Sequence, residues 1–218
     1  MLFSNRDTIL FTGDSITDAG RKRPIGEGKW DGVGNGYVRL IDVLLNVCYP
    51  ENTYHIVNTG ISGNTSRDLL ARWQTDVLDL KPDYVSVCIG VNDVWRQFDE
   101  PDCFYNHVDI QAYRQNLEKM IEITKDKVKG IILMTPYYME SNKEDLMRKK
   151  MDEYGAVVKE LAQKYNLICV DLQAEFDNYL KYRYSGYLQW DRVHPGPVGS
   201  MIIARAFLRA IGFDRKLI

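Results

Sequence analysis

The chain has 218 residues, of which 45% are hydrophobic and 27% are charged, a composition typical of one globular domain. Its 28 basic residues nearly balance 30 acidic ones, giving a formal net charge of −2, so no positive field is available to hold a nucleic acid. No apolar run approaches the about 20 residues that span a membrane, and the first residues lack the pattern of a secretory signal. We therefore expect one cytoplasmic domain over residues 1–218, with neither nucleic acid nor membrane as a partner.

The cysteines and histidines show no ligand spacing. The four cysteines form no Cys-x-x-Cys pair, and the three histidines lie far apart in the sequence, so we expect reduced thiols and no metal. The glycine-rich stretch 32–36 follows no predicted strand and lacks the spacing of a nucleotide fingerprint. The sequence therefore predicts no bound metal and no cofactor.

Short apolar runs alternate with helical periods along the whole chain. Strands are predicted over residues 8–12, 54–58, 84–89, 130–134 and 167–170, and helices over 37–49, from about 66 to 77, 113–121, 147–165 and 201–211. This alternation predicts an α/β fold with a parallel sheet covered on both faces. Ligands of such sheets bind beyond the carboxyl ends of the strands, so the loops after the first three strands are where chemistry is expected.

Polar residues gather in those loops and near the C-terminus. The four segments are Gly13–Asp18, Asn58–Asn64, Gly90–Asp93 and Asp191–Pro195. Taken singly, each has a structural explanation: Gly-Asp-Ser after a strand makes a good turn and helix cap, and Asn92-Asp93 could be only a turn. Taken together, they contain every group that acyl transfer requires.

The residues of these segments suggest specific roles. Ser15 would be a nucleophile, which needs an adjacent base to accept its proton; His194 can be that base, and Asp191 can orient it. The oxyanion donors would be the backbone N–H of Ser15, the backbone N–H of Gly60 and the side-chain amide of Asn92. A glycine at position 60 would let the chain approach the reacting centre closely.

These ordered blocks resemble those of the SGNH (GDSL) hydrolase family. The resemblance rests on Gly-Asp-Ser at 13–15, Gly60, Gly-x-Asn-Asp at 90–93 and Asp-x-x-His at 191–194. It implies a flavodoxin-like three-layer α/β/α sandwich with a five-stranded parallel sheet, in which the first strand lies between the second and third. The chain lacks the Gly-x-Ser-x-Gly elbow of α/β-hydrolases, which disfavours that rival serine-hydrolase fold.

Longer stretches around these blocks are similar to intracellular acetylxylan esterases of the same superfamily. They include residues 11–18, 60–65, 90–97, 130–136, 190–195 and 204–209. The resemblance implies removal of O-acetyl groups from xylo-oligosaccharides or xylan by a homo-oligomer.

Three further residues are candidates for contacting the substrate, and two other functions stay open. Trp190 could wall a small acyl pocket or simply pack; Trp95 could stack on a sugar; and Asp14 could contact substrate or only cap the turn. The alternatives are a thioesterase, lysophospholipase or lipid-acetyl hydrolase with the same triad, and a non-catalytic sugar-binding module.

Overall fold

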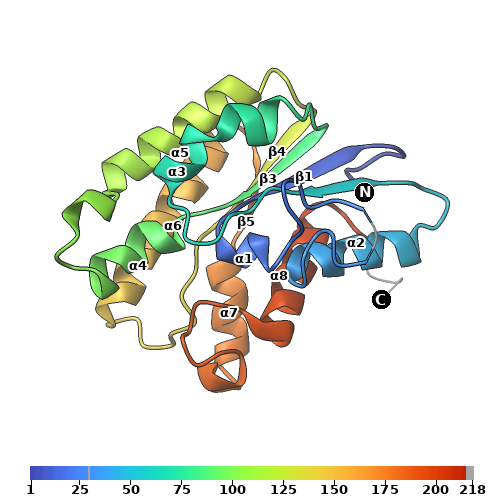
Figure 1. The fold of residues 1–218 in the computed structure, drawn as a ribbon. Coiled ribbons are helices and arrows are strands. Elements are labelled where there is room, and N and C mark those ends of the chain that lie inside the picture. Colours follow the sequence, from blue (N-terminus) through green and yellow to red (C-terminus); the bar gives the residue numbers. More distant parts are fainter. Residues whose placement is uncertain (29, 215–218) are drawn as a thin grey trace.

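The computed structural model describes residues 1–28 and 30–214 and is built around one parallel sheet (Figure 1). Its strand order is β2-β1-β3-β4-β5. The strands are β1 (Thr8–Gly13), β2 (His55–Asn58), β3 (Tyr84–Cys88), β4 (Gly130–Met134) and β5 (Ile168–Val170). Because β1 lies between β2 and β3, the direction of winding reverses there, as the flavodoxin-like topology predicts.

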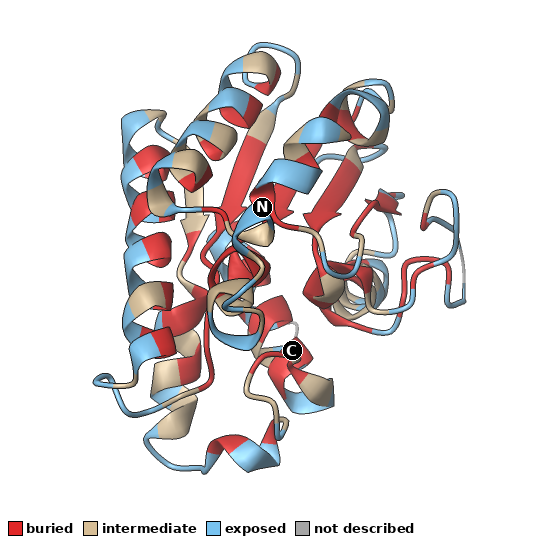
Figure 2. Ribbon diagram, turned by 60° about the vertical axis from the view of Figure 1, so that its left-hand side comes forward, coloured by how far each residue is buried: buried red, intermediate tan, exposed pale blue. Residues whose placement is uncertain are grey.

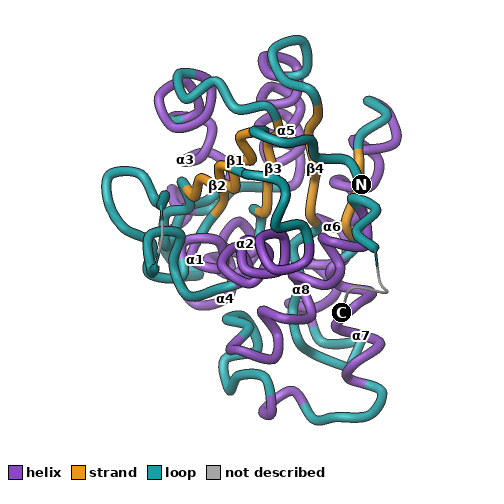
Figure 3. The backbone as a smooth tube through the Cα atoms, turned by 90° about the vertical axis from the view of Figure 1, so that its right-hand side faces the viewer, coloured by secondary structure: helices purple, strands orange, loops and turns teal. Residues whose placement is uncertain are grey.

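Helices cover both faces of the sheet, which explains why the strands are apolar along their length. On one side α2 (Tyr37–Cys48) packs against α8 (Gly196–Ala210). On the other, α5 (Ile110–Thr124) packs between α3 (Ser66–Ala71) and α6 (Leu146–Lys164) (Figure 1). Figure 2 shows that the strands are buried while the helices turn exposed residues outward, and Figure 3 shows the strands as a single layer among helices. The predicted three-layer sandwich is confirmed.

Several short elements differ from the predicted ones. The segment predicted as a loop after β3 is the first turn of α4 (Val91–Asp99), and the predicted helix after residue 66 is α3 followed by a π-helical turn, η1 (Gln74–Leu78). The sequence analysis missed α7 (Leu172–Leu180), the short α1 (Ser15–Asp18), and the 3₁₀ turns η2 (Phe104–Asn106) and η3 (Ser185–Tyr187). Asn92 and Asp93 misled the prediction because these residue types also favour turns.

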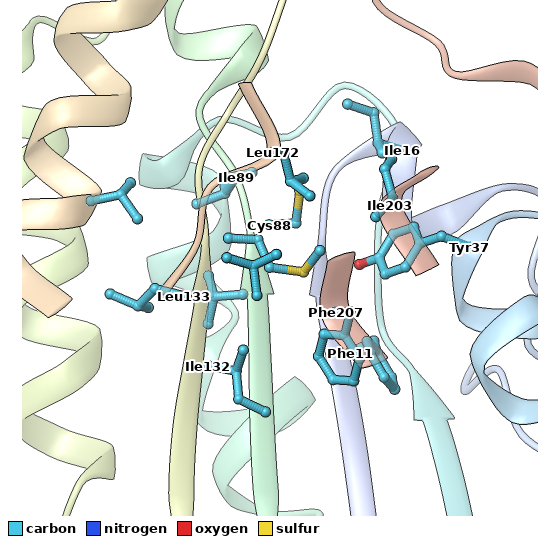
Figure 4. Close-up of a cluster of buried hydrophobic side chains, with 14 of the residues drawn as sticks. Phe11, Ile16, Tyr37, Cys88, Ile89, Ile132, Leu133, Leu172, Ile203 and Phe207 are labelled. Carbon is cyan, nitrogen blue, oxygen red and sulfur yellow. The ribbon is translucent and has the colours of Figure 1, made fainter. Parts of the chain in front are cut away.

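Aromatic side chains from α2 and α8 pack against β1, which lies between β2 and β3 (Figure 4). The ring of Phe11 lies 5.1 Å from that of Phe207 in α8 and 6.0 Å, edge to face, from that of Tyr37 in α2. All three side chains are fully buried, and truncating such a phenylalanine to alanine typically costs about 3–5 kcal/mol. This packing holds the strand whose carboxyl end carries Ser15.

Within the described part of the chain, no helix combines the length and apolar character needed to cross a membrane.

Candidate active site

The turn after β1 places Ser15 at the start of a helix. Gly13 has no room for a side chain, because a Cβ there would lie 2.0 Å from the carbonyl oxygen of Cys88 on the neighbouring strand. The Asp14 carboxylate then accepts a hydrogen bond from the N–H of Ile16 at 3.0 Å and caps α1. Ser15 is therefore the first helical residue, at the carboxyl edge of the sheet.

The segment before α8 brings an imidazole to this serine. The Oγ of Ser15 lies 2.9 Å from Nε2 of His194, and Nδ1 of His194 lies 2.7 Å from Oδ2 of Asp191. An ionised carboxylate can only accept hydrogen bonds, so Nδ1 carries the hydrogen and Nε2 of a neutral ring accepts from the Ser15 hydroxyl. The structure thus brings the three predicted residues together as a hydrogen-bonded relay.

Asp191 is held in place by its own loop. Burial opposes its ionisation, but hydrogen bonds from the His194 ring and from the N–H groups of Val193 and His194 outweigh this and lower the pKa of the carboxyl. The two N–H groups donate to Oδ1 at 2.9 and 3.0 Å, which leaves Oδ2 for the ring. Asp191 is therefore ionised at neutral pH, as the orienting member of such a relay must be.

The structure does not support Gly60 as an oxyanion donor. Its N–H already donates to Oδ1 of Asn58 at 2.9 Å, and Gly60 itself is buried. What the glycine permits is close packing, since a Cβ would lie 2.5 Å from the backbone nitrogen of Asp18. The expected close approach of the backbone is present at Gly60, but it brings the loop after β2 against Asp18 and does not bring Gly60 to the reacting centre.

Gly63, which the sequence analysis did not single out, has the features expected of that donor. It is exposed, with φ +84°, and within the described residues no hydrogen bond engages its N–H. The backbone N–H of Ser15 is likewise unengaged there. The side-chain amide of Asn92 donates one hydrogen to the carbonyl of Asn64 at 3.0 Å and retains a second.

Two buried carboxyl groups lie beneath this site. Asp14 and Asp93 are 1% and 0% exposed. Burial, augmented for Asp14 by repulsion from Asp93, raises the pKa of each to about 7. Asp93 accepts hydrogen bonds from the N–H of Ser66 at 3.0 Å and from its hydroxyl at 2.5 Å. Because Asp14 is buried, the prediction that it contacts the substrate is corrected. The alternative prediction, a cap of the turn, is the role observed.

The two candidate tryptophans lie in different environments. Trp95, in α4, is partly buried and places its ring 6.0 Å from the His194 imidazole at an interplanar angle of 61°. Trp190 is 83% exposed, so within the described chain its indole does not enclose an acyl pocket. Trp95 is therefore the tryptophan in contact with the relay.

A polar pocket of about 410 Å³ adjoins the candidate oxyanion donors. Gly63 lines it, and so does Arg96, whose guanidinium lies 3.4 Å from Oδ1 of Asn92. The other lining residues are Thr65, Arg67, Asp68, Glu100 and Asn106. Across the whole lining the two arginines balance the two acidic side chains, so the pocket suits an uncharged ligand rich in hydrogen-bonding groups. Among the described residues, no group of three or more His, Cys, Asp or Glu side chains is placed to hold a metal.

Comparison with known proteins gives concordant matches over nearly the whole chain. Residues 11–202 match the GDSL-like lipase/acylhydrolase family model. An acetylxylan esterase from Geobacillus stearothermophilus is 53% identical over 214 residues, covering 98% of both chains, and the crystal structure of this enzyme, Axe2, superposes with a TM-score of 0.97. LAE5, an alpha/beta hydrolase enzyme from the metagenome of Lake Arreo, is 47% identical with a TM-score of 0.96 and 98% coverage of both chains. Further matching structures are of catalytic mutants of Axe2, in which a serine, a histidine or an aspartate is replaced by alanine.

Proposed function

Because the chain belongs to the GDSL-like lipase/acylhydrolase family, we propose that it is a serine esterase that removes O-acetyl groups from a carbohydrate, with Ser15 as nucleophile. The observation that carries this proposal is the relay from Ser15 through His194 to Asp191, with distances of 2.9 and 2.7 Å. The same three residue types are those replaced in the catalytic mutants of the Geobacillus enzyme.

In the first half of the reaction, the Ser15 oxygen bonds to the carbonyl carbon of the acetyl ester. Its proton passes to Nε2 of His194, and the Asp191 carboxylate stabilises the resulting imidazolium through Nδ1. When the tetrahedral intermediate collapses, the bond from carbon to the sugar oxygen breaks and His194 returns the proton to that oxygen. The products are the free sugar hydroxyl and acetyl-Ser15.

In the second half, water replaces the sugar. His194 accepts a proton from water as its oxygen bonds to the acetyl carbon, and the imidazolium then protonates Ser15 Oγ as the acyl bond breaks. Acetate leaves, and the starting protonation state of the relay is restored.

The negative charge on the carbonyl oxygen needs donors fixed in advance. We assign this role to the N–H groups of Ser15 and Gly63 and to the free amide hydrogen of Asn92. Support comes from the absence of competing partners for the two N–H groups among the described residues and from the anchoring of the Asn92 amide on Asn64.

The substrate we propose is an acetylated xylo-oligosaccharide or xylan fragment. Support comes from the 53% identity to an acetylxylan esterase and from the charge-balanced pocket beside Gly63 and Arg96, where sugar hydroxyls would find both donors and acceptors. Acetate release from a panel of acetylated xylo-oligosaccharides, with acetylated hexosides beside it, tests this assignment. Equal rates on both sets would remove the preference for xylose.

The relay alone also fits a thioesterase, a lysophospholipase or a lipid-acetyl hydrolase. Comparing kcat/KM for acetyl, butyryl and octanoyl esters separates these functions, and we expect acetyl to be preferred. A preference for octanoate would favour a lipid substrate.

Labelling with a fluorophosphonate distinguishes an enzyme from a sugar-binding module. We expect one label per chain on the peptide containing Ser15, and much slower labelling of the His194→Ala variant, because the hydroxyl then lacks its base. An inert wild-type chain would support the binding module.

We further propose a cytoplasmic homo-oligomer. Three of the cysteines, Cys88, Cys103 and Cys169, are free thiols, which suits a reducing compartment. Exposed aromatic side chains gather in the segment between α7 and α8, namely Tyr182, Tyr184, Tyr187 and Trp190, as is common where subunits associate. Light scattering of the purified protein tests the assembly, and a monomeric mass would contradict it.

A further inference from the structure

One guanidinium connects the two loops that carry two of the candidate oxyanion donors, the N–H groups of Ser15 and Gly63. Arg72, the residue that follows α3, donates from Nη2 to the carbonyl of Gly13 at 3.0 Å and from Nη1 to the carbonyl of Thr59 at 2.7 Å. Its Nε donates to Oδ1 of Asn64 at 2.7 Å. Its side chain is 14% exposed, so these bonds form largely out of contact with water.

We propose that Arg72 is a positioning residue that sets the geometry of the oxyanion hole; this inference rests on the proposed esterase function. The Gly13 carbonyl lies one peptide before the N–H of Ser15. Asn64 follows Gly63 directly, and its backbone carbonyl accepts a hydrogen bond from the side-chain amide of Asn92. Arg72 therefore contacts a group next to each of the three donors, without contacting the substrate.

The chemistry of this position calls for arginine. Three acceptors from two loops surround one planar group, and the guanidinium supplies hydrogen-bond donors in a fixed fork that matches them. The ammonium of a lysine is a single point charge and cannot reach all three acceptors. The Asp76 carboxylate accepts from Nη1 at 2.8 Å and balances the charge. Burial lowers the pKa of the Arg72 guanidinium, which nevertheless stays charged at neutral pH.

Other hydrogen bonds also hold the two loops together. We therefore expect the guanidinium to fix the exact position of the donors and not to be needed for the loops to pack. The N–H of Ile61 also donates to the Gly13 carbonyl at 3.0 Å. Asp18 accepts from the N–H and the hydroxyl of Ser62, each at 3.0 Å. Removing Arg72 is therefore expected to leave a folded protein with misplaced donors.

The test compares Arg72→Gln and Arg72→Lys with Arg148→Gln. Arg148 is a matched control: its side chain is 2% exposed and binds the carbonyl of Glu140 and the carboxylates of Asp152 and Asp177, but neither of the two loops that Arg72 connects. Both glutamine variants are expected to lose thermal stability. Only Arg72→Gln should lower kcat for an activated acetyl ester by about 10²-fold with KM little changed, and Arg72→Lys should lose less.

A second readout isolates the oxyanion hole. A small alkylboronic acid forms a tetrahedral adduct on Ser15 that mimics the intermediate, so its Ki should rise in Arg72→Gln by the same factor by which kcat/KM falls. The midpoint of the kcat/KM profile against pH should not move, because the relay is untouched. Asn64→Ala, which removes only one acceptor, should show the same pattern more weakly and serves if Arg72→Gln does not fold.

The outcomes separate this inference from the proposed function. If Arg72→Gln keeps the wild-type kcat and boronate affinity, the positioning role is overturned and the proposed esterase function stands. Should Arg72→Gln not fold, the same result in Asn64→Ala overturns the positioning role. Equal kcat losses in Arg72→Gln and Arg148→Gln would reduce Arg72 to a general stabiliser and also overturn it. A wild-type chain that hydrolyses no acetyl ester would refute both.

Discussion

The Oγ of Ser15 lies 2.9 Å from Nε2 of His194, although 179 positions separate the two residues in the chain. Each is fixed by its own neighbourhood: Ser15 by the capped turn after β1, and His194 by the Asp191 carboxylate and by the start of α8. The contact forms because α8 packs back on the sheet beside α2 and places its N-terminus at the carboxyl edge of β1.

Asp191→Asn tests the orientation of the imidazole. An asparagine amide can donate to Nδ1, which would put the ring hydrogen on Nε2 and leave no acceptor for the Ser15 hydroxyl. We expect kcat to fall about 10⁴-fold, measured with an activated acetyl ester, with an unchanged circular dichroism spectrum. A loss of less than tenfold would mean that the carboxylate does not set the tautomer.

Gly60→Ala should mainly lose stability, whereas Gly63→Ala should mainly lose activity. At position 60 the added Cβ would meet the Asp18 nitrogen at 2.5 Å, so the free energy of unfolding should fall markedly. At position 63 nothing lies within 4 Å of the Cβ, but φ is +84°, which costs about 1–2 kcal/mol for alanine and should shift the donor.

Urea unfolding and kcat, measured on both variants, distinguish the two glycines. For Gly63→Ala we expect the larger loss in kcat and the smaller loss in stability. The reverse pattern would return the donor role to Gly60.

The buried carboxyls predict how stability depends on pH. Asp14 and Asp93 have pKa values of about 7 in the folded protein against 3.8 for an unperturbed aspartate. The unfolded chain therefore binds fewer protons between about pH 4 and pH 7, and the free energy of unfolding should fall as pH rises through that window. Above the folded pKa this contribution should level off.

Asp93→Asn removes one of the two titrations and should flatten this slope, measured by urea unfolding between pH 5 and pH 8. The amide oxygen can still accept from the N–H of Ser66, so the variant keeps part of the local bonding. Identical slopes in the wild-type and variant proteins would show that Asp93 is not protonated in this range.

Much of this architecture was predictable because strand ends are marked by sharp changes in polarity. The apolar run before Gly13 and the run from Tyr84 are each followed by polar residues, so the positions of Ser15 and Asn92 at one edge of the sheet follow from periodicity. The spacing of Asp191 and His194 likewise indicated one loop. The structure brings these four predicted residues to the same edge.

The choice between Gly60 and Gly63 could not be made from the sequence. Both glycines lie in one loop, and what separates them is that the Asn58 side chain turns back to occupy the N–H of Gly60. The role of Arg72 is hidden for a similar reason: its acceptors are carbonyls and an amide from distant segments. Likewise, only the packed structure shows that Asp14 is buried and Trp190 exposed.

The account depends most directly on Ser15. The decisive measurement is acetate release from acetylated xylo-oligosaccharides by the wild-type protein and by Ser15→Ala, with thermal unfolding recorded for both. We predict a loss of about 10⁶-fold, as for removal of the nucleophile from a comparable relay, with an unchanged melting temperature. Turnover by Ser15→Ala within tenfold of the wild-type rate would contradict the proposed mechanism.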